Sequence, residues 1–284
     1  MSGGELRYFR SDDGLDLACR VYGGDRAGLP VLCLPGITRN SRDFEDLAPH
    51  LAARGPVYCP DFRGRGLSAR DPEWRHYVPP TYVDDMLRLL DAFGLERAAF
   101  IGTSLGGLVS MLLRERAPAR VAGIVLNDIG PVIAPEGLER IKGYIGRLPP
   151  VADWDEAAAQ ARELYGIAWR GLSDADWRRL ARRGYREDDA GRPVLDMDPM
   201  IGEAARRAGT SFGDPWQALA ALDGLTLLVL QGEHSDILTA DIVAAMREHK
   251  PDLEHVVVAN RGHVPLLDEP EALAAIDEFL EALD

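Results

Sequence analysis

The sequence predicts an α/β protein with a mostly parallel central sheet and helices on both faces. Short apolar runs alternate with helical segments along most of the chain, and strands that are apolar along their whole length are typical of a parallel sheet covered on both sides. The alternation stops near Pro131 and resumes near residue 223. We therefore expect one core domain, formed by residues 1–131 and 223–284, with residues 132–222 inserted as a helical domain.

The expected elements of the core follow one another in a regular order. Residues 5–23 alternate polar and apolar around Asp13 and Gly14, which is typical of a β-hairpin. After it, short apolar runs predict strands, and apolar residues at intervals of three or four predict helices. The expected strands lie within residues 30–36, 56–62, 97–104, 121–130, 225–236 and 253–263, and the expected helices within residues 41–54, 79–95, 105–118, 239–251 and 269–283.

The inserted residues show a different pattern, with helical spacing and few strand signals. Helices are expected within residues 137–148, 154–169, 173–185 and 198–208. Residues 184–199 are polar and rich in Gly and Pro, so we expect a long loop there.

Composition argues against several classes of partner. The 284-residue chain has a formal net charge of −14, and an acidic surface repels nucleic-acid phosphates and anionic lipids. We therefore expect no nucleic-acid partner and no membrane association. Cys19, Cys33 and Cys59 lie in apolar runs without a C-x-x-C pair, which indicates reduced, buried thiols. Residues 1–14 show no apolar stretch typical of a signal peptide, so a cytoplasmic location is expected.

Three residue types of a nucleophilic triad follow expected strands. These residues are Ser104, Asp236 and His263. The carboxyl ends of parallel strands meet at one edge of a sheet, so we expect these side chains to lie together. A serine hydroxyl is a weak nucleophile that needs a base, an imidazole can take its proton, and a carboxylate fixes the imidazole tautomer. We predict these three residues as the catalytic group.

The glycines around Ser104 allow the tight turn that a nucleophilic serine needs. Gly102 and Gly106 flank a tight strand-to-helix corner, where a side chain would block close packing of the strand and the helix. The corner places Ser104 above the sheet beside the helix amino terminus. There the amide of Leu105 can donate a hydrogen bond to an oxyanion. We expect the second donor to be the amide of Ile37, in the loop after the strand of residues 30–36.

At this point the chain resembles the α/β-hydrolase superfamily. The resemblance covers nearly the whole chain and implies an α/β-hydrolase fold with an inserted helical cap at residues 132–222. The family usually has His-Gly in the oxyanion loop, whereas this chain has Pro35-Gly36, which keeps the backbone donor. The segments that carry the resemblance are GTSLG (102–106), LPGITRNS (34–41), DFRGRGLS (61–68), GEHSDIL (232–238) and RGHVPLLDEP (261–270).

The resemblance also bears on the acid and on substrate contacts. Some members of the superfamily supply the acid from the end of the strand after the nucleophile's helix, where this chain has Asp128. We take Asp236 as the acid and Asp128 as a residue that lines the site. Arg39 is a candidate for contact with a substrate carboxylate, with an ordinary ion-paired arginine as the alternative. Tyr144 and Trp169 fall in the cap and are candidates for the pocket wall.

The implied activity is that of a serine hydrolase, which cleaves a small carboxylic ester through an acyl-enzyme on Ser104. The alternatives on the same triad are a C–C bond hydrolase of ring-fission products, a lactonase and an amidase. A non-catalytic small-molecule receptor on the same fold is an alternative of a different class. The sequence contains no nucleotide-binding glycine motif, and His234 has no partner at metal-ligand spacing, so we expect neither a cofactor nor a metal.

Overall fold

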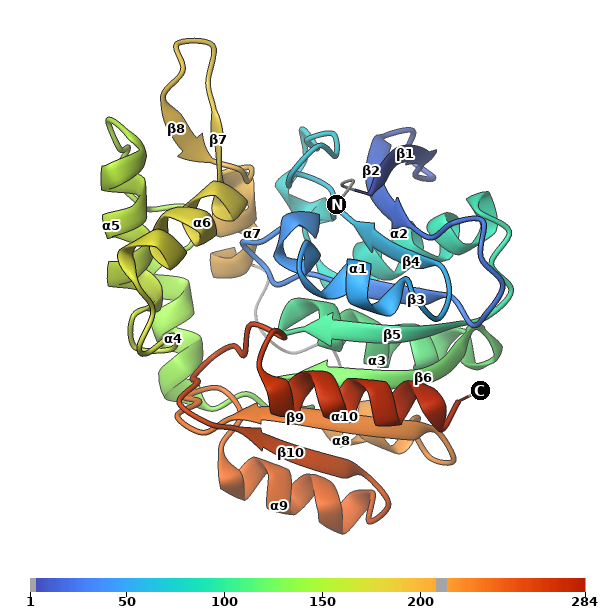
Figure 1. Cartoon of the computed structure of the whole chain (residues 1–284). Helices are drawn as coiled ribbons and strands as arrows, with labels where there is room; N and C mark the ends of the chain where they lie inside the picture. The colour runs from blue at the N-terminus through green and yellow to red at the C-terminus, as the bar shows by residue number, and fades with distance from the viewer. Residues whose placement is uncertain (1–3, 208–213, 284) are drawn as a thin grey trace.

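The centre of the molecule is an eight-stranded sheet (Figure 1). The computed structural model describes residues 4–207 and 214–283. The strand order is β1-β2-β4-β3-β5-β6-β9-β10; β2 is antiparallel to β1 and to β4, and the remaining pairs are parallel. The strands are β1 (Glu5–Arg10), β2 (Asp16–Tyr22), β3 (Val31–Leu34), β4 (Val57–Pro60), β5 (Ala98–Thr103), β6 (Val121–Asn127), β9 (Thr226–Gly232) and β10 (Glu254–Val258).

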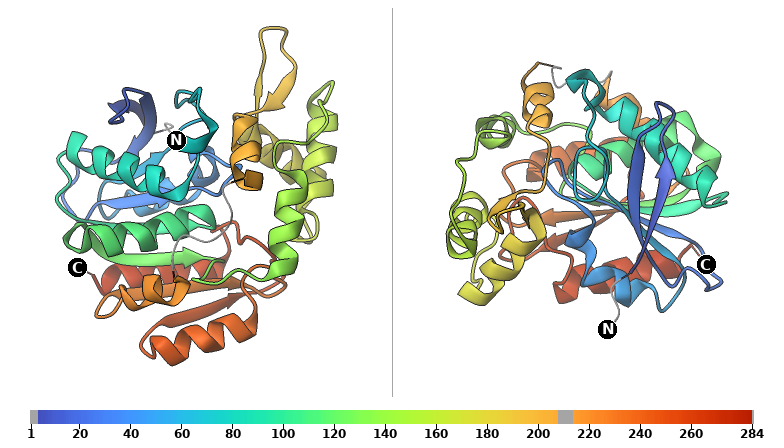
Figure 2. Two further views of the ribbon diagram at one scale, coloured as in Figure 1. Left: turned by 180° about the vertical axis from the view of Figure 1, so that it is seen from behind. Right: turned by 90° about the horizontal axis from the view of Figure 1, so that it is seen from above.

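Helices cover both faces of this sheet, as the apolar strands require. Helices α1 (Leu47–Leu51) and α10 (Pro270–Glu281) contribute to one apolar cluster, and α2 (Pro79–Ala92) and α3 (Leu105–Arg116) contribute to the other (Figure 2). Helix α9 (Ala240–His249) joins the second cluster through Val243 and Met246. The expected α/β architecture, with a mostly parallel sheet between helices and a hairpin at the start, is confirmed.

The chain between β6 and β9 lies beside the carboxyl ends of the parallel strands (Figure 1). It has an apolar cluster of its own, built around Trp169, Trp177 and Tyr185. The last helix of this stretch, α8, packs instead on α3 and α9. The elements here are α4 (Pro135–Tyr144), α5 (Trp154–Tyr165), α6 (Asp174–Gly184), β7 (Tyr185–Glu187), β8 (Pro193–Leu195), α7 (Met200–Arg207) and α8 (Pro215–Ala220).

We refer to α4–α7 and the β7–β8 hairpin as the cap. The boundaries at residues 132 and 222 stay a prediction, and residues 208–213 of that span lie outside the described residues. The expectation of a loop over residues 184–199 was wrong, because β7 and β8 pair there as an antiparallel hairpin. Its turn is closed by the amide of Asp188, which donates to the carbonyl of Arg192 at 2.9 Å, and by Gly191 at φ 75°. The two strands were not recognised in the sequence because each has only three residues and the turn that joins them is mostly polar.

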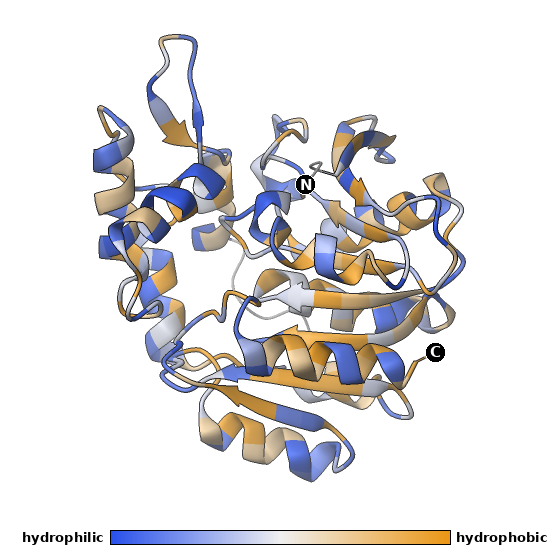
Figure 3. Cartoon of the chain, in the orientation of Figure 1, coloured by the Kyte–Doolittle hydropathy of each residue, from blue (hydrophilic) through white to orange (hydrophobic). Residues whose placement is uncertain are grey.

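Apolar residues concentrate on the sheet, whereas polar and apolar residues are interspersed on the cap helices (Figure 3). The three cysteines are free and buried on β2, β3 and β4, in agreement with the expectation of reduced thiols. Burial raises the pKa of Cys19 and Cys59 well above the ordinary thiol value. Within the described ranges no helix combines the length and apolarity needed to cross a bilayer.

Candidate active site

Ser104 stands at a strained corner between β5 and α3. Its backbone has φ 50° and ψ −112°, a conformation that a non-glycine residue adopts at a cost of about 1–3 kcal/mol. Two glycines make the corner possible. A Cβ on Gly106 would lie 2.1 Å from the carbonyl oxygen of Leu34, and a Cβ on Gly102 would lie 2.4 Å from the amide nitrogen of Gly107. Close approach of β3, β5 and α3 therefore holds Ser104 in place.

A histidine and a carboxylate continue the chain of hydrogen bonds from this serine. Nε2 of His263 lies 3.0 Å from Oγ of Ser104, and Nδ1 of His263 lies 2.7 Å from Oδ2 of Asp128. Asp128 has no solvent-exposed surface and directly follows β6. With Nδ1–H donated to the carboxylate, Nε2 is free to accept the hydroxyl proton of the serine.

The structure corrects the choice of acid. Asp236 does not contact His263; its carboxylate accepts from Nε and Nη2 of Arg140, at 2.5 and 2.8 Å. The reason lies in the backbone. The amide of Asp128 donates to the carbonyl of Leu230 in the next strand, which brings the Asp128 side chain under the imidazole. Asp236 lies beyond the end of β9, against helix α4, where a Cβ on Gly137 would be 2.2 Å from its carbonyl oxygen.

Asp128 is fixed by two further donors. Its Oδ1 accepts from the amide of Gly232 at 2.7 Å, and its Oδ2 accepts from the hydroxyl of Ser235 at 2.6 Å. These bonds set the orientation of the carboxylate toward His263. The sequence analysis considered Asp128 as the alternative acid but preferred Asp236, and it did not single out Ser235 or Arg140. Asp128 and Ser235 come together because β6 and β9 are neighbours in the sheet. Local sequence patterns do not give this strand order.

The two expected oxyanion donors lie at the same place. Leu105 is the first residue of α3, so its amide has no partner within the helix. Ile37 follows β3, and the Cβ position of its neighbour Gly36 is 3.9 Å from Cβ of Ser104. Within the described ranges, neither amide donates a hydrogen bond to another protein group. Both are therefore available to a ligand oxygen beside the serine.

Ser104 opens into an apolar cavity of about 140 Å³. Apart from Ser104, two tyrosines and Lys142, its walls are apolar side chains from the core and the cap. These apolar walls favour an aliphatic ligand group over a charged one. The lining residues are Ile37, Tyr77, Val78, Pro79, Tyr82, Ser104, Leu105, Leu108, Ile129, Ile133, Leu138, Ile141, Lys142, Ile145, Ala204 and Ala205.

The remaining candidates, Arg39, Tyr144 and Trp169, line a second and smaller cavity under the cap. The guanidinium of Arg39 lies over the rings of Tyr165 and Trp169, at 5.6 and 6.0 Å from their centroids. Burial opposes the charge of Arg39, but the adjacent Asp43 carboxylate raises its pKa above the ordinary value. For Tyr144, burial disfavours the ionised phenolate and therefore raises the pKa of the hydroxyl.

The cap is joined to the loop that carries the histidine. Nε1 of Trp169 donates to the carbonyl of Val264 at 2.7 Å, next to His263. The amide of Gly262 donates to the carbonyl of Ala168 at 2.7 Å, on the other side of the histidine. The position of His263 therefore depends on the cap as well as on the core.

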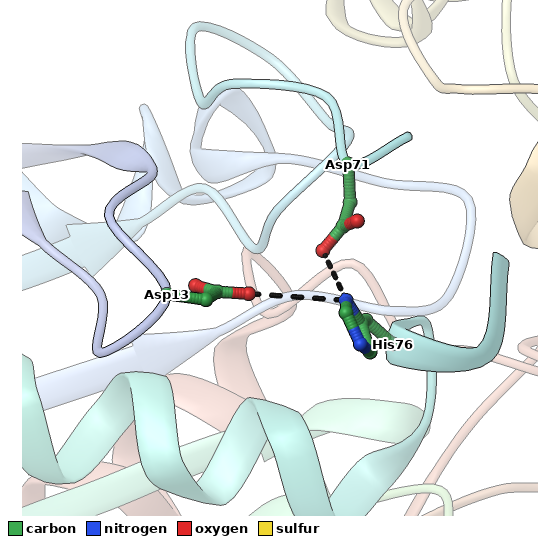
Figure 4. Close-up of side chains that lie close together, drawn as sticks. All are labelled: Asp13, Asp71 and His76. Carbon is green, nitrogen blue, oxygen red and sulfur yellow. Dashed lines mark hydrogen bonds and ion pairs between the residues drawn. The ribbon is translucent and has the colours of Figure 1, made fainter. Parts of the chain in front are cut away.

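One group among the described residues has the ligand types of a metal site: Asp13, Asp71 and His76, whose ligand atoms lie within 4.8 Å of one another (Figure 4). The guanidinium of Arg63 already occupies this cluster. Its Nη1 donates to Asp13 at 2.7 Å and to Asp71 at 2.6 Å. The hydrogen bond from Arg63 holds the pKa of Asp13 at about 2. The buried arginine thus supplies the positive charge that these carboxylates need, and the arrangement is structural.

Comparison with known proteins identifies the family to which this chain belongs. The sequence pattern of the alpha/beta hydrolase family matches residues 31–276. The chain belongs to this family. A 3-hydroxybutyrate-oligomer hydrolase from Cupriavidus necator is 32% identical over 265 residues, which cover 90% of each chain. A 2-(acetamidomethylene)succinate hydrolase from Mesorhizobium japonicum is 30% identical over 258 residues, covering 90% of this chain and 89% of the relative.

A solved structure extends the comparison to the whole fold. The crystal structure of an alpha/beta hydrolase from Novosphingobium aromaticivorans is 46% identical, with a TM-score of 0.93 over 99% of both chains. The expected superfamily and fold are confirmed, and the protein is accordingly a hydrolase. In this hydrolase the nucleophile corner lies between β5 and α3, and the inserted cap lies between β6 and β9.

Proposed function

We propose that this hydrolase cleaves a small carboxylic ester through an acyl-enzyme on Ser104. The observation that carries the proposal is the distance of 3.0 Å between Oγ of Ser104 and Nε2 of His263, beside two unpartnered amides. A hydroxyl in contact with a base, next to donors for an oxyanion, is what acyl transfer requires.

Each group has a role in two successive steps. His263 takes the proton of Ser104 as Oγ attacks the ester carbonyl, and the amides of Ile37 and Leu105 hold the oxyanion. The alcohol leaves with the proton from His263. A water molecule then loses a proton to His263 and attacks the acyl-enzyme, which releases the acid and restores Ser104. Asp128 holds the imidazole tautomer and stabilises its positive charge in both steps.

The relatives support an ester among the possible substrates. The curated relative that is 32% identical is named as a hydrolase of 3-hydroxybutyrate oligomers, whose units are joined by ester bonds. The apolar walls of the cavity at Ser104 suit a short aliphatic acyl or alcohol group. A short hydroxyacid oligomer belongs in the first substrate panel for this reason.

The test is hydrolysis of short p-nitrophenyl esters and 3-hydroxybutyrate oligomers by wild type and Ser104→Ala. Loss of a triad member leaves only about 10³–10⁴-fold acceleration over water, so Ser104→Ala should lower kcat by several orders of magnitude. Ser110→Ala is the matched control. Ser110 is also buried and lies on α3, where its hydroxyl donates to the carbonyl of Gly106 at 2.8 Å, away from His263.

Two outcomes would contradict the proposal. Turnover of ring-fission dienones but of no ester would assign the triad to C–C bond hydrolysis. Labelling of Ser104 by a fluorophosphonate probe without turnover of any ester, lactone or amide would favour a receptor. Neither outcome is compatible with an ester hydrolase.

A further inference from the structure

We propose that Arg39 forms a subsite for a carboxylate group of the substrate, so that the preferred ester is a monoanion with one aliphatic arm and one carboxylate-bearing arm. The inference rests on the proposed ester hydrolysis and deepens it. It assigns a substrate class, and it gives Arg39 a role in specificity.

The first observation is the position of Arg39 next to the nucleophile. The Cβ position of Gly36 lies 3.6 Å from Cγ of Arg39 and 3.9 Å from Cβ of Ser104. The amide of Arg39 donates to the carbonyl of Gly36 at 3.1 Å, which closes the turn that carries Ile37. The side chain of Arg39 therefore starts beside the reacting centre and extends under the cap.

The oxyanion loop separates the two cavities. Ile37 lines the larger cavity together with Ser104, whereas Thr38 and Arg39 line the smaller one, and Ile145 of the cap belongs to both. An ester whose carbonyl lies at the amides of Ile37 and Leu105 can therefore extend one arm into each cavity. The apolar arm fits the larger cavity, which leaves the smaller cavity for the other arm.

The smaller cavity is suited to an anion. Among its lining residues in the described part of the chain, Arg39 is the only one with a charged side chain. Thr38, Tyr144 and Tyr165 add hydroxyl groups, and the hydroxyls of Thr38 and Tyr165 lie 3.4 Å apart, whereas the hydroxyl of Tyr185 donates to Oε1 of Gln160 at 2.5 Å. Hydroxyls and a guanidinium together provide donors, and the carboxylate that is bonded to this guanidinium, that of Asp43, lies outside the cavity wall. The cavity volume of about 20 Å³ leaves room beside Arg39 for no more than the end of one substituent.

The guanidinium of Arg39 is presented with one edge occupied. Its Nε and Nη2 donate to the carboxylate of Asp43 at 2.9 and 2.6 Å, and only 12% of its side chain is exposed. Nη1 lies on the opposite edge, 2.7 Å from the Cβ position of Gly184. Asp43 and the rings of Tyr165 and Trp169 fix the orientation of the group, so the edge with Nη1 is preorganised.

The experiment compares esters in matched pairs. The first pair carries the charge on the acyl side: p-nitrophenyl hydrogen glutarate and p-nitrophenyl pentanoate. The second pair carries it on the alcohol side: 3-carboxypropyl butyrate and butyl butyrate. For each pair the ratio of kcat/KM, anionic over neutral, is measured in wild type, Arg39→Met and Gly184→Ala.

In at least one pair, Arg39→Met should lower the ratio by about 10- to 100-fold, the range expected for one hydrogen bond to a charged group. Gly184→Ala should lower it as well, because the added methyl group meets Nη1 while the pair of Arg39 and Asp43 stays intact. This second variant keeps the test valid if Arg39→Met folds poorly. Arg140→Met is the control, because Arg140 lines neither cavity and should leave the ratio unchanged.

The results separate the two proposals. Equal ratios in wild type, Arg39→Met and Gly184→Ala, with the neutral esters still hydrolysed, overturn the carboxylate subsite and leave ester hydrolysis standing. A ratio that falls as far in Arg140→Met as in Arg39→Met also overturns the subsite, because it shows a general effect of positive charge. No turnover of any of the four esters by wild type counts against both.

Discussion

The loops after β6 and β9 each carry an aspartate, and the two aspartates do different work. Asp128, after β6, is fully buried and contacts His263 at 2.7 Å. Asp236, after β9, has 32% of its side chain exposed and forms an ion pair with Arg140 of the cap. The two loops are linked, since Ser235 next to Asp236 donates to Asp128 at 2.6 Å.

This comparison shows that a strand end alone does not make a catalytic acid. Both aspartates follow parallel strands at the same edge of the sheet, but only Asp128 has its amide bonded to the neighbouring strand, at the carbonyl of Leu230. That bond and φ 57° direct the side chain of Asp128 inward, under the imidazole. Asp236 lies farther along its loop and faces α4. In the proposed mechanism the loop after β6 therefore supplies the acid that orients His263, while the loop after β9 binds Asp128 through Ser235 and the cap through Asp236.

Replacement of the two aspartates gives the largest expected contrast. Asp128→Asn should lower kcat for esters by about 10³–10⁴-fold, because an amide that donates to Nδ1 forces the proton onto Nε2 and removes the base. Asp236→Asn should change kcat by less than about threefold, as for a surface substitution. The measurement is steady-state kinetics on one p-nitrophenyl ester. The reverse ranking would restore Asp236 as the acid and break the comparison.

An intermediate effect is expected where the cap meets the histidine loop. Trp169→Phe keeps an aromatic ring in the cap cluster and removes the donor to the carbonyl of Val264. We expect kcat to fall about 3- to 10-fold, in line with the loss of one hydrogen bond, while KM for a small neutral ester changes little. Trp177→Phe, in the same cluster, should affect stability but not kcat. A drop in kcat of equal size in both variants would mean that general cap packing is responsible.

The smallest expected effect concerns pH and the pair of Asp236 and Arg140. Burial raises the pKa of Asp236, but the hydrogen bond and charge of Arg140 outweigh it, so the net pKa is below the ordinary value of 3.8. A carboxylate with a lowered pKa stabilises the folded state above 3.8, and this stabilisation is lost as the pH falls below that value. For a partly exposed pair it amounts to about 0.2–1 kcal/mol.

Urea unfolding of wild type and Asp236→Asn between pH 7 and pH 3 measures this contribution. The difference between the two free energies of unfolding should be constant near neutral pH and should shrink in the acidic range. A difference that stays constant down to the lowest pH would show that Asp236 contributes through packing and not through its charge.

The sequence was sufficient for the core strands and helices and for Ser104 and His263, because these depend on local patterns, but it did not predict β7, β8 or α8. Apolar runs and helical spacing predicted the alternation of the core, and the glycines beside Ser104 predicted the strained corner. The choice between Asp128 and Asp236 depends instead on the pairing of β6 with β9 and on the position of α4. These contacts join segments that are far apart in the sequence. Helix α4 contributes Arg140, and nothing in its spacing relates it to Asp236. The β7–β8 hairpin was missed because each of its strands has only three residues and the turn between them, residues 188–192, is mostly polar.

The buried thiols on β2, β3 and β4 make it possible to distinguish opening of the core sheet from movement of the cap. All three belong to the core sheet, and residues 132–222 contain no cysteine. No covalent cross-link holds the fold, so reductants have nothing to cleave. An alkylating reagent therefore reacts with these thiols only when the sheet opens. Movement of the cap alone leaves the three thiols unreacted. The wild-type chain thus already carries three thiols whose rate of alkylation measures opening of the core, and movement of the cap can be compared with that rate.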